Sequence, residues 1–300
     1  MAQRDVKNRI ASVKNIQKIT RAMEMVAAAR LRRAEQRIAA LRPYADAIRR
    51  MTRQAAEAAG NVPALPILSE HDEERRVALL LVTADRGLAG AFNSQIIRAG
   101  VRTAADYQAD GREVVYYATG RRGVSSLTFR GTEPEQGFTG FTERPSYANA
   151  REIAHALTAA YVDGKVDRVE ILYNGYISPI SQEVRRETLL PLQQATILEA
   201  TPGGEEEAQE PSGHHALVEY EPEPEEILQR LVPDYVEISI YRALLESTAS
   251  GLGARMTAMR SASDNAGDII GDLTLEMNRA RQAEITQEIM EVVGGAEALR

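Results

Sequence analysis

The chain has 300 residues, 44% of them hydrophobic, which is enough for one large domain or two modest ones with a buried core. It contains no cysteine, which excludes disulfide bonds, thiol redox switching and cysteine-ligated metals. The formal net charge of −7 provides no overall attraction to nucleic acid. No apolar run is long enough to cross a membrane as a helix.

The first predicted element is a long helix at residues 3–58, which would extend about 80 Å. Pro43 is expected to kink it or to remove one of its hydrogen bonds, and Gly60, Pro63 and Pro66 are expected to end it. Apolar or small residues recur at a mean spacing near 3.5, which predicts a coiled coil with a second helix. They are Val6, Ile10, Val13, Ile16, Ile19, Met23, Val26, Leu31, Ala34, Ile38, Leu41, Tyr44, Ile48 and Met51.

This first helix is strongly basic, because residues 1–53 contain fourteen Lys and Arg against four acidic residues. A solvated helix face is the usual meaning of such a run. A nucleic-acid-binding helix is a second interpretation, but interleaved aromatic residues and a recognisable binding motif are missing. A third interpretation is a basic shaft surrounded by acidic protein surfaces, where complementary charge steers assembly.

The middle of the chain, residues 75–200, is predicted to form a small and mostly parallel α/β sandwich, because strands alternate with helices. A helical stretch extends to Tyr107, and a second helix is predicted at 147–163. The predicted strands are 75–84, 113–119, 168–174 and, at an edge of the sheet, 183–192.

The turn TADRGLAG, at residues 83–90, has the position of a phosphate-binding loop in a doubly wound domain. It lacks the GxGxxG pattern, however, and no GxxxxGK[ST] occurs anywhere in the chain. A tight strand-to-helix turn that uses Gly87 and Gly90 is therefore favoured. Asp85 and Arg86 are either functional or merely cap and pair locally. We predict no catalytic residue, cofactor or metal site, because no catalytic pattern has a defensible spacing.

An acidic stretch follows at 201–226, with nine Glu and no Lys or Arg, and is predicted to be a mobile loop. The pair His214 and His215 lies in it, but two adjacent histidines without further spaced ligands are a weak indication of a metal site.

The last predicted element is a helix at 233–294, about 90 Å long, with Pro233 in its first turn and Gly294 and Gly295 at its end. Both long helices attach to the central segment, so they must run antiparallel if they pair, with the two termini together at the far tip. Its apolar stripe is Tyr235, Ile238, Leu245, Ala249, Leu252, Met256, Met259, Ala266, Ile270, Leu273, Met277 and Ala280.

The predicted fold class is therefore α+β. A long antiparallel two-helix coiled coil, formed by the N- and C-terminal segments, carries a central α/β, Rossmann-like domain. The predicted boundaries are 1–60 for the first helix and 70–221 for the central domain, with an acidic loop near 201–219. The second helix is assigned to 222–300.

Several stretches resemble the gamma subunit of F-type ATP synthases of the bacterial type, and they extend from end to end of the chain. The N-terminal part of the resemblance is RIASVKNIQKITRAMEMVAAARLRRA and RPYA, and the first strand and turn match in TADRGLAGAFN. The C-terminal part consists of YRALLES (241–247), ARMTAMRSASDNAGDII (254–270) and LTLEMNRARQAEITQEIMEVVGGAEAL (273–299).

The resemblance implies a rotor shaft that couples rotation of a c ring to conformational change at the catalytic sites of beta subunits. The shaft would be a single copy inside a ring of alternating alpha and beta subunits, with its foot on the c ring and the epsilon subunit. It would have no catalytic site and no cofactor of its own, and would bind no nucleic acid. The lack of a presequence favours a bacterial protein, peripheral on the cytoplasmic side of the cell membrane.

The resemblance also implies roles for single residues. Met23, in AMEM, would face the moving lever of the beta subunit, although its place on the apolar stripe also fits simple core packing. The positions that match contacts with the ring near its catalytic loops are Arg281, Gln282 and Thr286. Those that match contacts with the c-ring loops are Tyr220 and Glu221, of which Tyr220 could equally anchor its own loop.

Two functions of other classes remain as alternatives. A nucleotide-binding α/β protein with a helical oligomerisation rod would bind its ligand as an isolated chain. A nucleic-acid-binding coiled coil would show steep salt dependence of binding. The plastid form of the resembled family carries a cysteine-bearing regulatory insertion, and the absence of cysteine excludes that redox control here.

Overall fold

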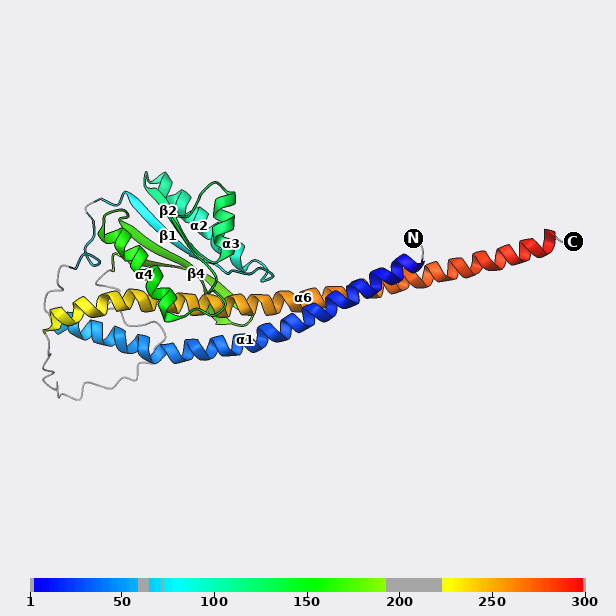
Figure 1. The fold of residues 1–300 in the computed structure, drawn as a ribbon, viewed down its shortest axis with the longest axis horizontal. Coiled ribbons are helices and arrows are strands. Elements are labelled where there is room, and N and C mark those ends of the chain that lie inside the picture. The colour runs from blue at the N-terminus through cyan, green and yellow to red at the C-terminus, as the bar shows by residue number, and fades with distance from the viewer. Residues whose placement is uncertain (1–2, 59–64, 72, 193–222, 299–300) are drawn as a thin grey trace.

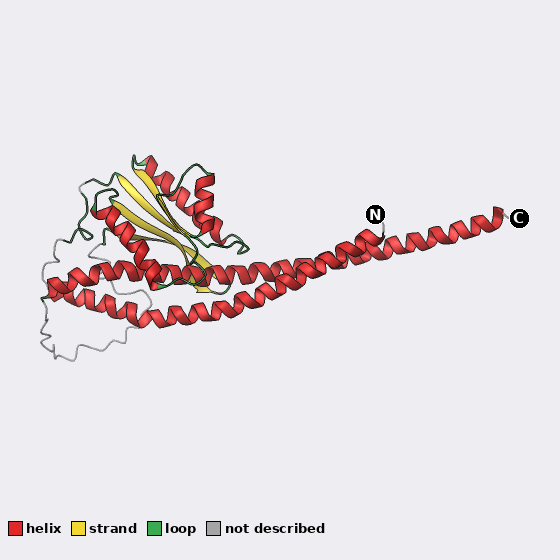
Figure 2. Ribbon diagram, in the orientation of Figure 1, coloured by secondary structure: helices red, strands yellow, loops and turns green. Residues whose placement is uncertain are grey.

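A computed structural model describes residues 3–58, 65–71, 73–192 and 223–298. Two long helices form a rod, and a sheet flanked by shorter helices lies along one side of it (Figures 1 and 2). The first helix, α1, comprises Gln3–Ala58, and the last, α6, comprises Pro224–Ala298. They run antiparallel, as the sequence predicted.

The two helices differ in length, with 56 residues in α1 and 75 in α6. At 1.5 Å per residue they extend about 84 Å and about 112 Å. The C-terminal end of α6 therefore projects well beyond the N-terminus of α1 (Figure 1). The prediction that both termini lie together at the tip is wrong.

The prediction that the last helix starts at Pro233 and ends at Gly294 and Gly295 is also wrong, because α6 begins at Pro224 and continues through all three residues. In the same way α1 continues through Pro43. A proline inside a helix removes one backbone hydrogen bond. On either side of Pro233, Val232 and Val236 are buried in the core of the sheet domain, and this packing outweighs the local preference.

The two helices meet along a seam in which steps of three and four residues alternate strictly, as in a left-handed coiled coil. On α1 the seam passes through buried or half-buried positions. They are Val6, Ile10, Val13, Gln17, Thr20, Glu24, Ala27, Leu31, Ala34, Ile38, Leu41, Ala45, Ile48, Thr52 and Ala55. The predicted stripe of α6 is confirmed at its buried positions, including Ile238, Ala249, Leu252 and Leu273.

The predicted stripe of α1 is wrong in its middle, because polar residues occupy the seam there. The Gln17 side-chain amide donates to the Ser263 carbonyl oxygen at 3.2 Å, and the Arg260 guanidinium donates to Glu24 at 2.8 Å. Apolar residues that we had placed on the seam are instead half or more exposed: Ile16, Ile19, Val26, Tyr44 and Met51.

Within the described residues the sheet has five strands, in the order β3-β2-β1-β4-β5. The first four are parallel, and β5 pairs antiparallel with β4 at one edge. Their bounds are β1 Arg76–Val82, β2 Glu113–Thr119, β3 Gln136–Phe138, β4 Arg168–Ser178 and β5 Ser181–Leu190. The four predicted strands are confirmed within a few residues, and the short β3 was not predicted.

Helices cover both faces of the sheet (Figure 1). On one face lie α2 (Phe92–Ala109) and α3 (Arg121–Phe129), of which α3 was not predicted. On the other lie α4 (Tyr147–Val162) and the first part of α6. Alternate residues of β1 serve the two cores, with Leu79 packed toward α2 and Leu80 toward α4 and α6. The rod helix α6 is therefore also one layer of the domain.

Candidate functional surfaces

A groove of about 580 Å³ lies between α1 and the turn that follows β1. Met23 lines it and is half-buried, outside the described core clusters. Ile19 and Val26 on α1 and Leu88 in the turn are more than half exposed and form its apolar walls. Met23 is thus a surface residue in this structure. Two of the apolar residues displaced from the predicted seam, Ile19 and Val26, lie at this groove.

The turn after β1 is held by the carboxylate of Asp85. This group accepts hydrogen bonds from the backbone N–H of Arg121, at the start of α3, at 3.1 Å. It also accepts from the N–H groups of Gly140 (3.0 Å) and Thr142 (3.1 Å) and from the Thr142 hydroxyl (2.8 Å). Burial raises the pKa of Asp85, but these hydrogen bonds outweigh it and hold the pKa below its usual value.

These donors occupy the position that binds phosphate in doubly wound domains, at the carboxyl ends of the parallel strands. Gly120 has φ of 80°, and a side chain there would lie 2.4 Å from the Thr83 carbonyl oxygen, so only glycine brings α3 this close to β1. The Thr83 hydroxyl accepts a further N–H of the first turn of α3, from Gly123, at 2.8 Å. This group of N–H donors, which we call the cradle, is therefore occupied by oxygen atoms of Asp85 and Thr83. Its occupation argues against nucleotide binding at this turn.

Arginines surround the other end of the groove. Glu143 accepts an ion pair from Arg30 at 2.7 Å, from Arg255 at 3.1 Å and from Arg86 at 3.5 Å. Three guanidinium groups around one carboxylate leave a net positive surface. A second groove of about 440 Å³ continues from it. It is lined by further arginines that pair with no carboxylate in the described part of the chain: Arg33, Arg37 and Arg144.

The predicted contact residues at the tip lie on the part of α6 that extends beyond the N-terminus of α1. The last cluster between the helices joins Val6 and Ile10 to Leu273. Beyond it residues 281–295 are all exposed, including Arg281, Gln282 and Thr286. The Thr286 hydroxyl donates to the Gln282 carbonyl oxygen at 2.8 Å, a bond within the helix. Large apolar side chains are exposed on the same stretch: Ile285, Ile289, Met290, Val292 and Val293.

Two predicted contacts cannot be placed, because Tyr220 and Glu221 lie outside the described residues. So do the acidic loop at 201–219 and the pair His214 and His215. Among the residues that the structure describes, no group of His, Asp and Glu is arranged to hold a metal ion. In the same residues no helix is long and apolar enough to cross a membrane.

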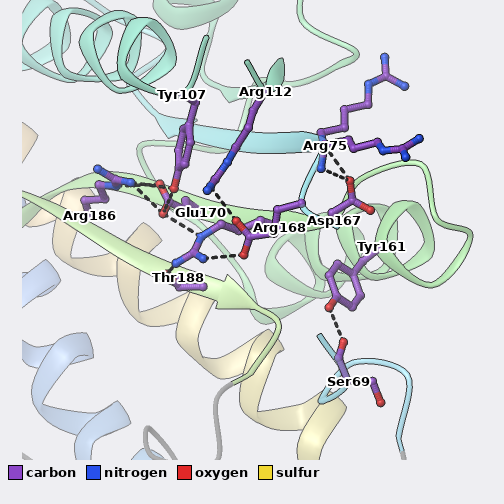
Figure 3. A network of polar contacts seen from close by, with 12 residues as sticks. Ser69, Arg75, Tyr107, Arg112, Tyr161, Asp167, Arg168, Glu170, Arg186 and Thr188 are labelled. Carbon is purple, nitrogen blue, oxygen red and sulfur yellow. Dashed lines mark hydrogen bonds and ion pairs between the residues drawn. The ribbon is translucent and has the colours of Figure 1, made fainter. Parts of the chain in front are cut away.

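A buried polar network on the sheet was not predicted (Figure 3). Glu170 on β4 is 2% exposed and accepts hydrogen bonds from Tyr107 at 2.7 Å, Arg186 at 2.7 Å and Arg168 at 3.2 Å. Burial, then the bond with Glu170, raises the pKa of the Tyr107 hydroxyl. The Tyr107 ring also lies 5.3 Å from each of the Arg112 and Arg186 guanidinium groups. The network joins α2, β4 and β5 into one rigid unit.

Comparison with known proteins matches residues 2–299 to the family model described as ATP synthase. A protein of Rubrobacter xylanophilus named ATP synthase gamma chain is 41% identical, and the match covers 99% of this chain and 98% of the relative. The gamma chain of Streptomyces coelicolor is 43% identical, with 98% and 94% covered. The chain belongs to the ATP synthase gamma chain family. A gamma chain is a non-catalytic subunit of that complex.

Solved structures agree with this gamma chain fold. The central stalk and c-ring structure of Tetrahymena thermophila mitochondrial ATP synthase contains a chain with a TM-score of 0.60 and 26% identity, covering 82% of this chain and 99% of that one. A chain in the Euglena gracilis mitochondrial ATP synthase has a TM-score of 0.68, with 99% and 94% covered. At 17% identity the second likeness concerns the fold alone.

Proposed function

We propose that this gamma chain is the shaft that couples rotation of a c ring to conformational change at the beta subunits of a proton-translocating ATP synthase. The observation that carries the proposal is the shape of the rod. One half of it is fixed to the sheet domain, and the other ends in a single helix whose apolar side chains have no partner within the described chain. Such a surface suits a rod that is enclosed by other subunits.

The rod differs from one side to the other, and a rotor requires this asymmetry. A beta subunit that meets the groove beside Met23 makes contacts that differ from those on the opposite face of α1. Rotor angle then changes the relative stability of the open and closed conformations of each beta subunit, and hence its affinity for nucleotide. The groove, with Met23 in its floor and Arg30, Arg86 and Arg255 at its end, is our proposed contact for the beta lever.

The other contacts follow from the same arrangement. The exposed tip would turn inside the alpha and beta ring, with Arg281, Gln282 and Thr286 near its catalytic loops. Tyr220 and Glu221 would meet the c-ring loops, and the epsilon subunit would bind the foot. In a bacterium the complex would be peripheral on the cytoplasmic side of the cell membrane, with one copy of this chain.

The first test is co-expression of alpha and beta subunits with and without this chain, followed by measurement of ATP hydrolysis. We expect one copy of the chain per three beta subunits and a higher turnover with it. The purified chain alone should hydrolyse no ATP. Nucleotide hydrolysis by the chain alone, without entry into the ring, would contradict the proposal.

A second test addresses the groove. The double variant Ile19→Gln, Val26→Gln makes two exposed groove walls polar, and Met25→Gln is the matched control. Met25 is also exposed on α1 but does not line the groove. We expect the double variant to assemble normally and to lose roughly tenfold in turnover, about 1.4 kcal/mol of coupling energy. Equal activity of the double variant and the control would remove the groove from the mechanism.

A further inference from the structure

The turn after β1 forms one wall of the groove, and its conformation is not one that its own sequence favours. Leu88 has φ of 61°, in the left-handed region that costs free energy for a residue with a side chain. Its side chain is 64% exposed, so burial of that side chain does not stabilise the turn. Something else must hold residues 86–88 against α1.

The residue at the base of this turn supplies the restraint. The Asp85 carboxylate is hydrogen-bonded to two separate parts of the chain: the start of α3, at Arg121, and the segment after β3, at Gly140 and Thr142. Its own backbone N–H donates to the Thr142 hydroxyl at 2.8 Å. Hydrogen bonds to an ionised acceptor are stronger than those between neutral groups. This one side chain therefore joins the turn to two neighbours at the same edge of the sheet.

We propose that Asp85 is a positioning residue, whose carboxylate is a built-in anion that holds residues 86–88 in place as the wall of the groove beside Met23. The anion is required because three N–H groups and a hydroxyl converge on it, and a neutral side chain cannot satisfy them all. The inference rests on the proposed function and deepens it, because it names a residue that holds one wall of the proposed lever contact in place. The placement itself does not depend on any partner.

A simpler role for Asp85 would be only to cap α3. In that case its removal would loosen the first turn of α3 and leave Leu88 where it is. Removal of Asp85 should make residue 88 mobile if Asp85 positions the turn, and should leave it fixed if Asp85 only caps α3. The test must therefore measure the mobility of residue 88.

The experiment uses the natural absence of cysteine, which makes any introduced thiol unique. The full-length variant Leu88→Cys carries a nitroxide spin label, and its mobility is measured by electron paramagnetic resonance. A second reporter, Val162→Cys at the end of α4, is 48% exposed and monitors the rest of the domain. Each reporter is combined with Asp85→Gly, which leaves a cavity for a small anion, and with Asp85→Asn.

We expect Asp85→Gly to increase the mobility of the label at 88 roughly threefold and to leave the label at 162 unchanged. Formate supplies a free carboxylate and should restore the immobile spectrum, whereas chloride at equal ionic strength should not. Asp85→Asn should give an intermediate increase that formate does not reverse. Asp110→Asn is the matched control, because Asp110 lies at the end of α2 and its carboxylate forms no hydrogen bond or ion pair in the described structure.

An unchanged spectrum at 88 in Asp85→Gly, with the fold intact by circular dichroism, would overturn the proposal. Increased mobility that formate fails to restore would also overturn the claim that an anion is required. Should Asp85→Gly not fold, Thr142→Val removes one hydroxyl donor to Asp85. A more mobile label at 88 in that variant would support the proposal, and an unchanged label would contradict it.

The inference and the proposed function can fail separately. The spectra test the placement in the isolated chain, and ATP turnover of the complex with alpha and beta subunits tests its consequence. Restoration of the spectrum by formate without restoration of turnover would leave Asp85 as a positioning residue and remove the groove from the lever contact.

Discussion

The helix α6 contributes to both the sheet domain and the free end of the rod, yet its burial differs greatly between these two regions. Near its start α6 packs against α1 on one side and the sheet on the other, and Leu228, Val232 and Ile240 are fully buried. Past Arg281 it has no neighbour in the described chain, and residues 281–295 are all exposed. The buried core is therefore concentrated at one end of the molecule, and the other end is a single exposed helix.

The comparison predicts that a cavity in the sheet domain has the largest effect. Leu80 on β1 is fully buried between two neighbouring strands, where it is level with Tyr117 and Ile171. Leu80→Ala should reduce the free energy of unfolding by about 3 kcal/mol, since the site cannot collapse around the lost atoms. Urea unfolding followed by circular dichroism measures the change. A loss below about 1 kcal/mol would show that the domain is less tightly packed than the structure indicates.

A substitution in the buried polar network around Glu170 should have the second-largest effect on the free energy of unfolding. Glu170→Gln keeps the shape of the side chain but removes its charge beside Arg168 and Arg186, and we expect a loss of about 2 kcal/mol. The control is Glu183→Gln on the neighbouring edge strand β5, where the side chain is 61% exposed, and it should change stability by less than about 0.5 kcal/mol. Equal effects of the two variants would mean that the network contributes no more than a surface ion pair.

A substitution in the seam of the rod should have a smaller and more local effect. Leu273→Ala removes the centre of the cluster with Val6 and Ile10, and should cost about 1–2 kcal/mol because that cluster is small. Hydrogen exchange should accelerate in the first two turns of α1 and remain unchanged in β1. Leu275→Ala, at an exposed position two residues away, is the control. Uniform acceleration over the whole chain would contradict the division between rod and domain.

Acid should weaken the turn at Asp85. The pKa of Asp85 is lower in the folded chain than its ordinary value of 3.8. Its ionised form therefore stabilises the fold at pH values above 3.8, and this contribution is lost as the pH falls through the folded pKa. Asp85→Asn should be less stable than the natural chain near neutral pH, and the difference should diminish below pH 3.8. A difference that is independent of pH would mean that the charge of Asp85 does not matter.

The smallest effect on stability is expected at the tip. Met290 is 68% exposed, so Met290→Gln should change the free energy of unfolding by less than about 0.5 kcal/mol. The same variant should weaken assembly with the alpha and beta ring, because we propose that the ring encloses the exposed apolar side chains of the tip. Loss of stability in the isolated chain, measured by thermal unfolding, would show that the tip has a partner within its own chain.

The apolar stripe of α1 shows where prediction from sequence succeeded and where it failed. The mean spacing of apolar residues correctly indicated a long helix paired with another. It placed Ile16, Ile19 and Val26 on the seam, however. Where polar residues occupy seam positions, the apolar residues nearby belong to a neighbouring face of the helix, and their mean spacing alone does not reveal this. Gln17 and Glu24 were the missed signal, since both continue the strict alternation of three- and four-residue steps that begins at Val6.

The cradle at Asp85 shows a different limit. The sequence TADRGLAG correctly indicated a strand followed by a tight turn, and the missing glycine pattern argued against phosphate. That Asp85 itself fills the cradle could not be predicted, because its donors lie 36 to 57 positions further along the chain. In the same way nothing local marked Glu170 as the centre of a network, because Tyr107 belongs to α2 and Arg186 to β5.

The sequence by itself determined the elements whose signals are local and repeated. These are the two long helices, the alternating strands and helices between them, and the absence of a phosphate-binding motif. Only the tertiary structure decided which face of α1 is buried, how far α6 extends alone, and that α6 is also a layer of the sheet domain. The physical reason is that burial of a helix face depends on its neighbours, and those neighbours are supplied by residues more than two hundred positions away.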